Sequence, residues 1–263
     1  MRTSLWPGLV QALQYNVNRQ QPRVRLFETG LRFLPNTDHN TATSADNVAG
    51  LLQQPMLAGI IYGSREDESW LSGSDKSSDK VDFYDLKGDV ESLLAITGQP
   101  ERFSFIKSTC KALHPGQSAD VIFDGQVVGS LGALHPQLQQ KLDLTQAVYL
   151  FELLLAPIQA TALPCFTPLS KFPEVRRDLA IVVDQNIATL ELEKRIYEVA
   201  GDNLTKLKVF DVYVGKGIDS HRKSVALGLT FQHLSRTLTD EEINLSVDNT
   251  VDTLKHVFNA ELR

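Results

Sequence analysis

The spacing of apolar residues along the chain predicts several amphipathic helices. In each, apolar side chains recur every three or four positions, which places them on one helical face. Thr239 and Glu242 form a capping box, in which each side chain bonds the other's backbone N–H at a helix start. Gly201 is typical of a residue that ends a helix. These signals predict helices at residues 7–19, 86–97, 189–200 and 239–258, and a short one after Pro136.

Other segments alternate apolar and polar residues or carry short apolar runs, and these patterns are typical of strands. Asp124-Gly125 between two such runs predicts a tight hairpin. Two polar stretches, residues 35–54 and 64–80, are expected to be surface loops. The predicted strands lie at residues 24–34, 56–62, 119–123, 127–131, 148–155, 179–183, 207–214, 225–231 and 260–262.

Prolines divide the chain. Residues 157–173 hold four prolines and no periodic pattern, so we expect a domain at 1–157, a linker at 158–170 and a second domain at 171–263. The second domain reads βαββαβ in about 90 residues, which is the ferredoxin-like order of elements. The fold class expected for the whole chain is therefore α+β.

Composition limits the classes of protein to which the chain can belong. The 263 residues are 42% hydrophobic and carry a formal charge of −6, as in ordinary globular proteins. No apolar run reaches the length of a membrane span, and the N-terminal residues do not form a signal peptide pattern. Two cysteines are too few for a disulfide scaffold, and a cytoplasmic location is expected.

One basic region stands out on this acidic chain. Residues 206–236 carry six Lys or Arg and only two acids. Strand alternation puts Asp211 and Tyr213 on one face, whereas Phe210, Val212 and Val214 are expected to meet the helices. An aromatic ring on an open sheet face with cations around it suits single-stranded RNA. The residues alone support an ordinary solvated sheet face equally well.

The remaining candidates for catalytic or metal-binding residues are better explained by structural roles. His114 and His135 each precede a proline, with no third ligand spaced for zinc, and we expect turn and helix-start roles. Asp82, Asp85 and Asp89 surround a predicted helix start, where carboxylates favour the helix dipole.

Several longer strings resemble one family. The segments at residues 1–9, 24–30, 81–91 and 131–136 look like the C-terminal third of the bacterial phenylalanyl-tRNA synthetase beta subunit. Phe172–Ala180 and Phe210–Tyr213 are similar to its ferredoxin-fold anticodon-binding domain. The resemblance spans essentially the whole chain and implies that the chain is a fragment of a longer subunit.

The resemblance implies different roles for two subunits, alpha and beta. The family's alpha subunit activates phenylalanine with ATP and Mg²⁺ and charges tRNA-Phe, while the beta subunit contributes a silent copy of the class II synthetase core to an (αβ)₂ assembly. Residues 1–157 would be that degenerate antiparallel-sheet core, with no catalytic residue, metal or cofactor of its own. The sequence agrees, because no arginine occurs between Arg102 and Arg176 to hold ATP phosphates, and Arg25 lies three residues before Glu28 rather than two.

The resemblance also assigns site residues. Residues matching Asp211, Tyr213 and Ser224 approach the first anticodon base, a guanine, and the nearby Arg222, Lys223 and Lys216 are expected to contact RNA. The partners would be the alpha subunit and tRNA-Phe, with no membrane. The alternative is a free-standing RNA-binding or interaction protein that reuses both domains, and an autonomous adenylate-forming enzyme is disfavoured by the missing arginines.

Overall fold

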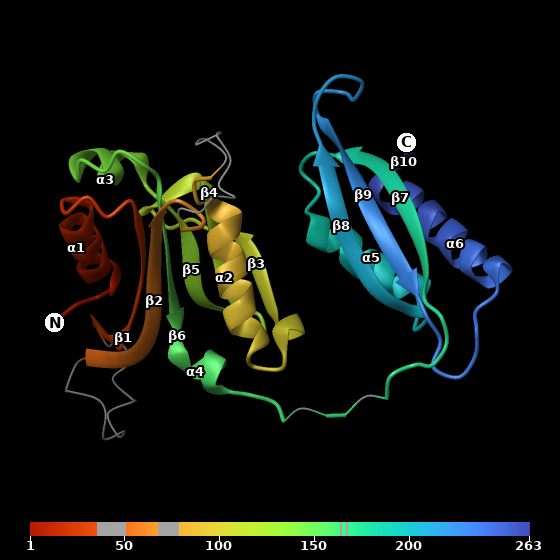
Figure 1. Ribbon diagram of the computed structural model, residues 1–263, viewed down its shortest axis with the longest axis horizontal. Coiled ribbons are helices and arrows are strands. Elements are labelled where there is room, and N and C mark those ends of the chain that lie inside the picture. Colours follow the sequence, from red (N-terminus) through yellow and green to blue (C-terminus); the bar gives the residue numbers. More distant parts are fainter. Residues whose placement is uncertain (36–50, 68–78, 164, 167) are drawn as a thin grey trace. The chain divides into compact units, whose positions relative to one another are not determined.

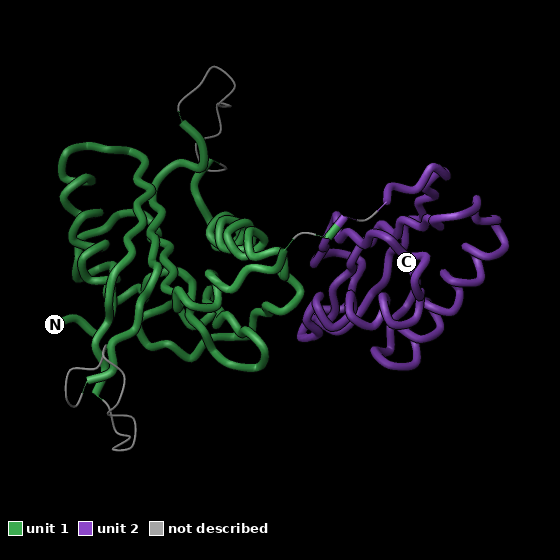
Figure 2. Tube along the Cα trace, turned by 90° about the horizontal axis from the view of Figure 1, so that it is seen from below, with its two compact units in different colours: residues 1–165 green, residues 166–263 purple. Residues whose placement is uncertain are grey.

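The computed structural model describes residues 1–35, 51–67, 79–163, 165–166 and 168–263. The chain forms two compact units, unit 1 (Met1–Cys165) and unit 2 (Phe166–Arg263), shown in Figure 2. Each unit has buried hydrophobic clusters of its own. The described residues from Ala160 to Glu174 form neither helix nor strand.

Unit 1 is built on a six-stranded antiparallel sheet in the order β1-β2-β6-β5-β4-β3 (Figure 1). The predicted Asp124-Gly125 hairpin is confirmed, and both residues have positive φ, 47° and 81°. The strands are β1 (Arg23–Pro35), β2 (Leu51–Gly63), β3 (Phe103–Lys107), β4 (Leu113–Phe123), β5 (Gln126–Leu134) and β6 (Val148–Leu154).

The expected loop at residues 35–54 is partly wrong. Leu51 pairs with Pro35 and Gln54 with Arg32, so strand pairing extends β2 into a segment too polar to be recognised as a strand. Residues 36–50, and 68–78 of the second expected loop, lie outside the described residues. The sequence patterns also gave no separate signal for β3.

Helices cover both faces of this sheet. Ile60 and Tyr62 belong to the core under α1 (Trp6–Val17), whereas Ile61 belongs to the core under α2 (Phe83–Ala95). Two short helices, α3 (Pro136–Lys141) and α4 (Leu155–Gln159), and a 3₁₀ turn, η1 (Pro100–Arg102), complete unit 1. No helix in the described ranges is long and apolar enough to cross a membrane.

The helix start expected at His135 is confirmed, whereas His114, for which a turn was expected, lies inside β4. The Nδ1 atom of His135 accepts a hydrogen bond from the backbone N–H of Gln137 at 3.2 Å and caps α3. The Nδ1 atom of His114 accepts from the N–H of Gly116 at 3.0 Å. Each ring thus satisfies a backbone donor two residues further along the chain.

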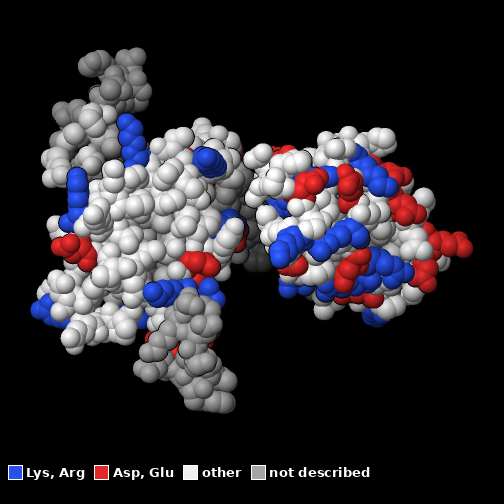
Figure 3. Space-filling model, turned by 90° about the horizontal axis from the view of Figure 1, so that it is seen from above, with Lys and Arg blue, Asp and Glu red and all other residues white. Residues whose placement is uncertain are grey.

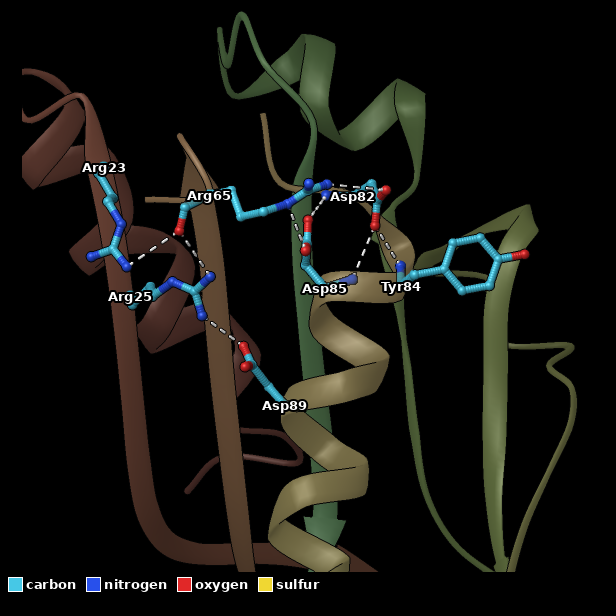
Figure 4. Close-up of polar contacts among 7 residues, drawn as sticks. All are labelled: Arg23, Arg25, Arg65, Asp82, Tyr84, Asp85 and Asp89. Atoms are coloured by element: carbon cyan, nitrogen blue, oxygen red, sulfur yellow. Dashed lines mark hydrogen bonds and ion pairs between the residues drawn. The ribbon is translucent and has the colours of Figure 1, made fainter. Parts of the chain in front are cut away.

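Charged side chains fix the start of α2 against β1 and β2 (Figure 4). Asp82 and Asp85 form a capping box, in which Asp82 accepts from the N–H groups of Tyr84 and Asp85, and Asp85 accepts from the N–H of Asp82. Arg65 bonds Asp85 at 2.8 Å, which raises the pKa of the Arg65 guanidinium, and Arg25 bonds Asp89 at 2.7 Å. The three carboxylates expected at a helix start are therefore all engaged in structural contacts.

Unit 2 has a four-stranded antiparallel sheet in the order β10-β7-β9-β8, with both helices on one face (Figure 1). The predicted βαββαβ order is confirmed. Strand residues Leu227, Leu229 and Phe231 are fully buried against the helices, and no described helix lies on the opposite face. The elements are β7 (Val175–Asp184), α5 (Thr189–Ala200), β8 (Leu204–Tyr213), β9 (Arg222–Phe231), α6 (Asp240–Phe258) and β10 (Glu261–Leu262).

The capping box of α6 is confirmed, and its Glu242 carboxylate should make the stability of unit 2 depend on pH. Arg236 bonds both carboxylate oxygens of Glu242 at 2.7 Å, and Thr239 donates its N–H at 3.0 Å, so the pKa of Glu242 falls from 4.5 to about 2. Because the folded pKa is depressed, this stabilisation is present above about pH 4.5 and is lost as the pH falls through about 2.

Glu242→Gln should therefore be less stable than the wild type near neutral pH, and the difference should shrink as the pH falls through this window. Urea unfolding at a series of pH values measures it. Glu241→Gln, in the same helical turn, is the matched control. A difference that does not change with pH would contradict the proposed role of the Glu242 charge.

Candidate nucleic-acid interface

The open face of the unit 2 sheet brings three of the predicted site residues together. Tyr213 on β8 pairs with Ser224 on β9, and Asp211 pairs with Ala226 one step along the same face. Val225 and Leu227, on either side of Ala226 in β9, are buried against the helices, so Ser224 and Ala226 lie on the face away from the core. Asp211 is exposed and the Tyr213 side chain is 37% exposed, whereas Ser224 is only 4% exposed.

Arg263, which was not among the expected site residues, contacts Tyr213 and Ser224. The Arg263 guanidinium carbon lies 5.3 Å from the centre of the Tyr213 ring, and its Nη1 donates to the Ser224 hydroxyl at 3.4 Å. Strand β10 delivers it, with the backbone N–H of Arg263 bonded to the carbonyl of Ala180 at 3.0 Å. Arg263 and Ser224 are 39 residues apart, and no local pattern in the sequence links them.

A β-bulge changes the other face assignment. Val209 pairs with Leu227 and the next pair is Asp211 with Ala226, so Phe210 has no residue opposite it. The expectation that Phe210 meets the helices is wrong, since its side chain is 49% exposed and contacts Arg176. One extra residue in a strand reverses the side to which the next residues point. Val212 lies opposite the buried Val225, yet it is half-exposed, as is Val214.

The two basic residues at the start of β9 are held by the fold. Arg222 donates to the carbonyls of Val182 at 2.8 Å and Asn259 at 2.7 Å and forms an ion pair with Glu261. Its side chain therefore fastens β10 to the sheet. Lys223 is not brought to the Tyr213 ring. It lies on the helix side opposite Val183, where its Nζ donates to the carbonyl of Ile187 at 2.5 Å.

Burial lowers the pKa of Lys223, and the Asp184 charge partly offsets this effect. Lys216 is exposed in the loop after β8, and its backbone carbonyl accepts from the Tyr213 hydroxyl at 3.3 Å. Two further cations belong to the basic region but were not among the expected RNA-contacting residues. Lys206 and Lys208 lie opposite Thr230 and Gly228, and both are exposed on the open face.

Comparisons with known proteins give two separate matches, one within each of the two units. Residues 1–155 match the family model described as the phenylalanyl tRNA synthetase beta chain CLM domain, and residues 170–263 match the ferredoxin-fold anticodon binding domain. The chain belongs to the phenylalanyl-tRNA synthetase beta chain family. The anticodon-binding match covers all of the sheet and helices of unit 2.

Curated relatives support the family membership. The phenylalanine--tRNA ligase beta subunits of Pseudomonas fluorescens (strain Pf-5) and Pseudomonas syringae pv. tomato are 51% and 50% identical over all 263 residues. The subunit of Pseudoalteromonas translucida is 47% identical over the same length. The chain spans 31% of the length of each Pseudomonas relative and 32% of the third.

Among solved structures, a pyrrolysyl-tRNA synthetase from Desulfitobacterium hafniense is 16% identical, covering 60% of this chain and 48% of that one with a TM-score of 0.40. This likeness is too weak to carry an argument. The family membership rests on the sequence matches.

Proposed function

We propose that this chain is the non-catalytic part of a phenylalanine-tRNA ligase that binds the anticodon region of tRNA-Phe through unit 2 and the alpha subunit through unit 1. The main observation behind the proposed RNA binding is that Asp211, Tyr213 and Ser224 lie together on the sheet face opposite the helices, in a domain that matches an anticodon-binding family. The relatives named above are beta subunits of this ligase.

The chemistry of this face suits a guanine. The Tyr213 ring offers a stacking surface, and the Asp211 carboxylate accepts hydrogen bonds from the donors on the guanine Watson–Crick edge. Lys206 and Lys208 on the same face provide charges for the phosphates. A carboxylate near phosphates is otherwise unfavourable, so Asp211 fits base recognition better than backbone binding.

Unit 1 has features of a subunit interface. Strand β1 is at the edge of its sheet, and Phe27 on it is 78% exposed. The surface of unit 1 visible in Figure 3 is largely free of charged side chains, in contrast to the charged surface of unit 2. An exposed aromatic on a long edge strand is typical of a surface that a partner covers.

The same unit is proposed to be silent in catalysis. Arg25 of β1 is paired with Asp89, and the long arginine-free stretch of the sequence offers no replacement. ATP and Mg²⁺ would be bound by the alpha subunit in the cytoplasm. Co-purification of the 263-residue chain with the alpha subunit tests the interface, and failure to retain alpha would count against this part of the proposal.

A pair of lysine variants tests RNA binding by the open face. Lys208→Ala should weaken binding of tRNA-Phe similarly for all anticodon sequences and lower the salt slope by about 1, because one phosphate contact is lost. Lys223→Ala removes the same charge from the opposite face and is the matched control, with a smaller effect expected. Binding isotherms at several salt concentrations measure both. Equal losses, or no tRNA binding by the wild type, would contradict the proposed face.

A further inference from the structure

We infer that Phe210 and Arg176 form a second base-binding subsite on the open face, which takes an unpaired base from the nucleotides next to the one on Tyr213. This inference rests on the proposed function and extends it to a second nucleotide. Both residues lie in the segments that resemble the anticodon-binding domain, but the sequence does not show that they meet, because the bulge in β8 and the pairing of β7 with β9 bring them together.

The geometry places both side chains on the open face. The Arg176 guanidinium lies over Gly228, where an added Cβ would come within 2.8 Å of Arg176 Nη2. Gly228 lies between the buried Leu227 and Leu229, so its missing side chain would point away from the helices. The guanidinium carbon is 5.5 Å from the centre of the Phe210 ring. The absence of a side chain at Gly228 thus makes room for this contact.

The subsite repeats the arrangement around Tyr213. In each case an aromatic ring of β8 lies beside an arginine from another strand, Arg176 for Phe210 and Arg263 for Tyr213. Asp178 bonds the Arg176 Nε at 2.7 Å and orients the guanidinium while leaving its other nitrogens for a phosphate or a base edge. The Phe210 side chain is 49% exposed, so about half of it remains available for contact.

The spacing of the rings indicates which RNA would fit. Phe210 and Tyr213 are three positions apart in β8, a distance of about 10 Å at 3.3 Å per residue. Successive nucleotides in a duplex strand rise only about 3.4 Å. Bases on the two rings would therefore be splayed apart, as they are when proteins bind single-stranded loops. Phe210 has no hydrogen-bonding group, so its subsite should accept any base, in contrast to the guanine preference expected at Tyr213.

The test measures dissociation constants of the full 263-residue chain for the anticodon stem-loop of tRNA-Phe. Phe210→Ala should weaken binding about tenfold or more through loss of one stacked base, and Phe210→Tyr should restore it. Val212→Ala, on the same strand but on the helix side, is the control and should bind as the wild type does. Arg176→Lys should keep the salt dependence but lose affinity, because an ammonium lacks the planar stacking surface.

Loop RNAs with single abasic nucleotides complete the test. The loss caused by Phe210→Ala should disappear on one abasic RNA, and that position should differ from the one coupled to Tyr213→Ala. If Phe210→Ala binds as the wild type does, or loses the same affinity on every abasic RNA, the subsite is wrong even where Tyr213→Ala weakens binding. If the wild type binds no stem-loop at all, the proposed function fails together with it.

Discussion

Replacing Phe231 by alanine should lower the free energy of unfolding of unit 2 by about 3–5 kcal/mol and leave unit 1 unchanged. Phe231 is 1% exposed in β9, where it pairs with Val175 on one side and Leu204 on the other. Losing a fully buried ring leaves a cavity in the cluster of unit 2, while the clusters of unit 1 share no residue with it. A domain of this size is stable by only about 5–15 kcal/mol, so the effect is large.

The two units can be followed separately during urea unfolding. Trp6 lies in α1 and packs against a hydrophobic cluster of unit 1, so its fluorescence in a Trp70→Phe background reports unit 1. Hydrogen exchange of the β9 amides reports unit 2. Phe166→Ala deletes an equivalent ring that is 89% exposed and should change neither transition. A tryptophan transition that shifts together with the β9 amides in Phe231→Ala would show that the units unfold as one.

Tyr213→Ala should cost roughly 1–3 kcal/mol of binding to an anticodon stem-loop with guanine at the first anticodon position, because a base stack is lost. The ring is fixed by its hydroxyl bond to the Lys216 carbonyl and by the neighbouring Arg263, so the stacking surface is preorganised. Tyr15→Ala removes an exposed tyrosine from α1 of unit 1 and is the control for nonspecific effects.

Asp211→Asn should act on base preference rather than on overall affinity. An amide presents donors as well as an acceptor, so the match to the guanine Watson–Crick edge is lost while the phosphate contacts stay. Binding of stem-loops with guanine or adenine at the first anticodon position, at several salt concentrations, separates the two effects. If Asp211→Asn and Tyr213→Ala leave both affinity and base preference unchanged, this face does not read the anticodon.

Local signals in the sequence were enough to predict most elements. The bounds of α5 agree with the prediction, since its apolar spacing and Gly201 are both properties of neighbouring residues. The same holds for the capping box of α6 and the Asp124-Gly125 hairpin. Alternation also put Tyr213 on the open face together with Ser224.

What could not be predicted depends on pairing between distant segments. The bulge at Phe210 is a mismatch between two strands, and the residues of one strand do not show it. Arg176 and Arg263 reach the site from β7 and from the end of β10, which tertiary structure alone brings near β8. Alternation with Val225 already places Lys223 on the helix side, but only the structure shows that its Nζ donates to the Ile187 carbonyl.

The connection between β8 and β9 has a consequence for the order of folding. Only residues 214–221 separate these strands, whereas the pairing of β7 with β9 joins Val175 to Phe231. Closing a short loop costs less chain entropy, so the β8–β9 hairpin has the kinetic advantage. Phe210 and Tyr213 both belong to that hairpin. As the chain folds, the aromatic surface is thus assembled early, and Arg176 and Arg263 are added when the more distant strands join it.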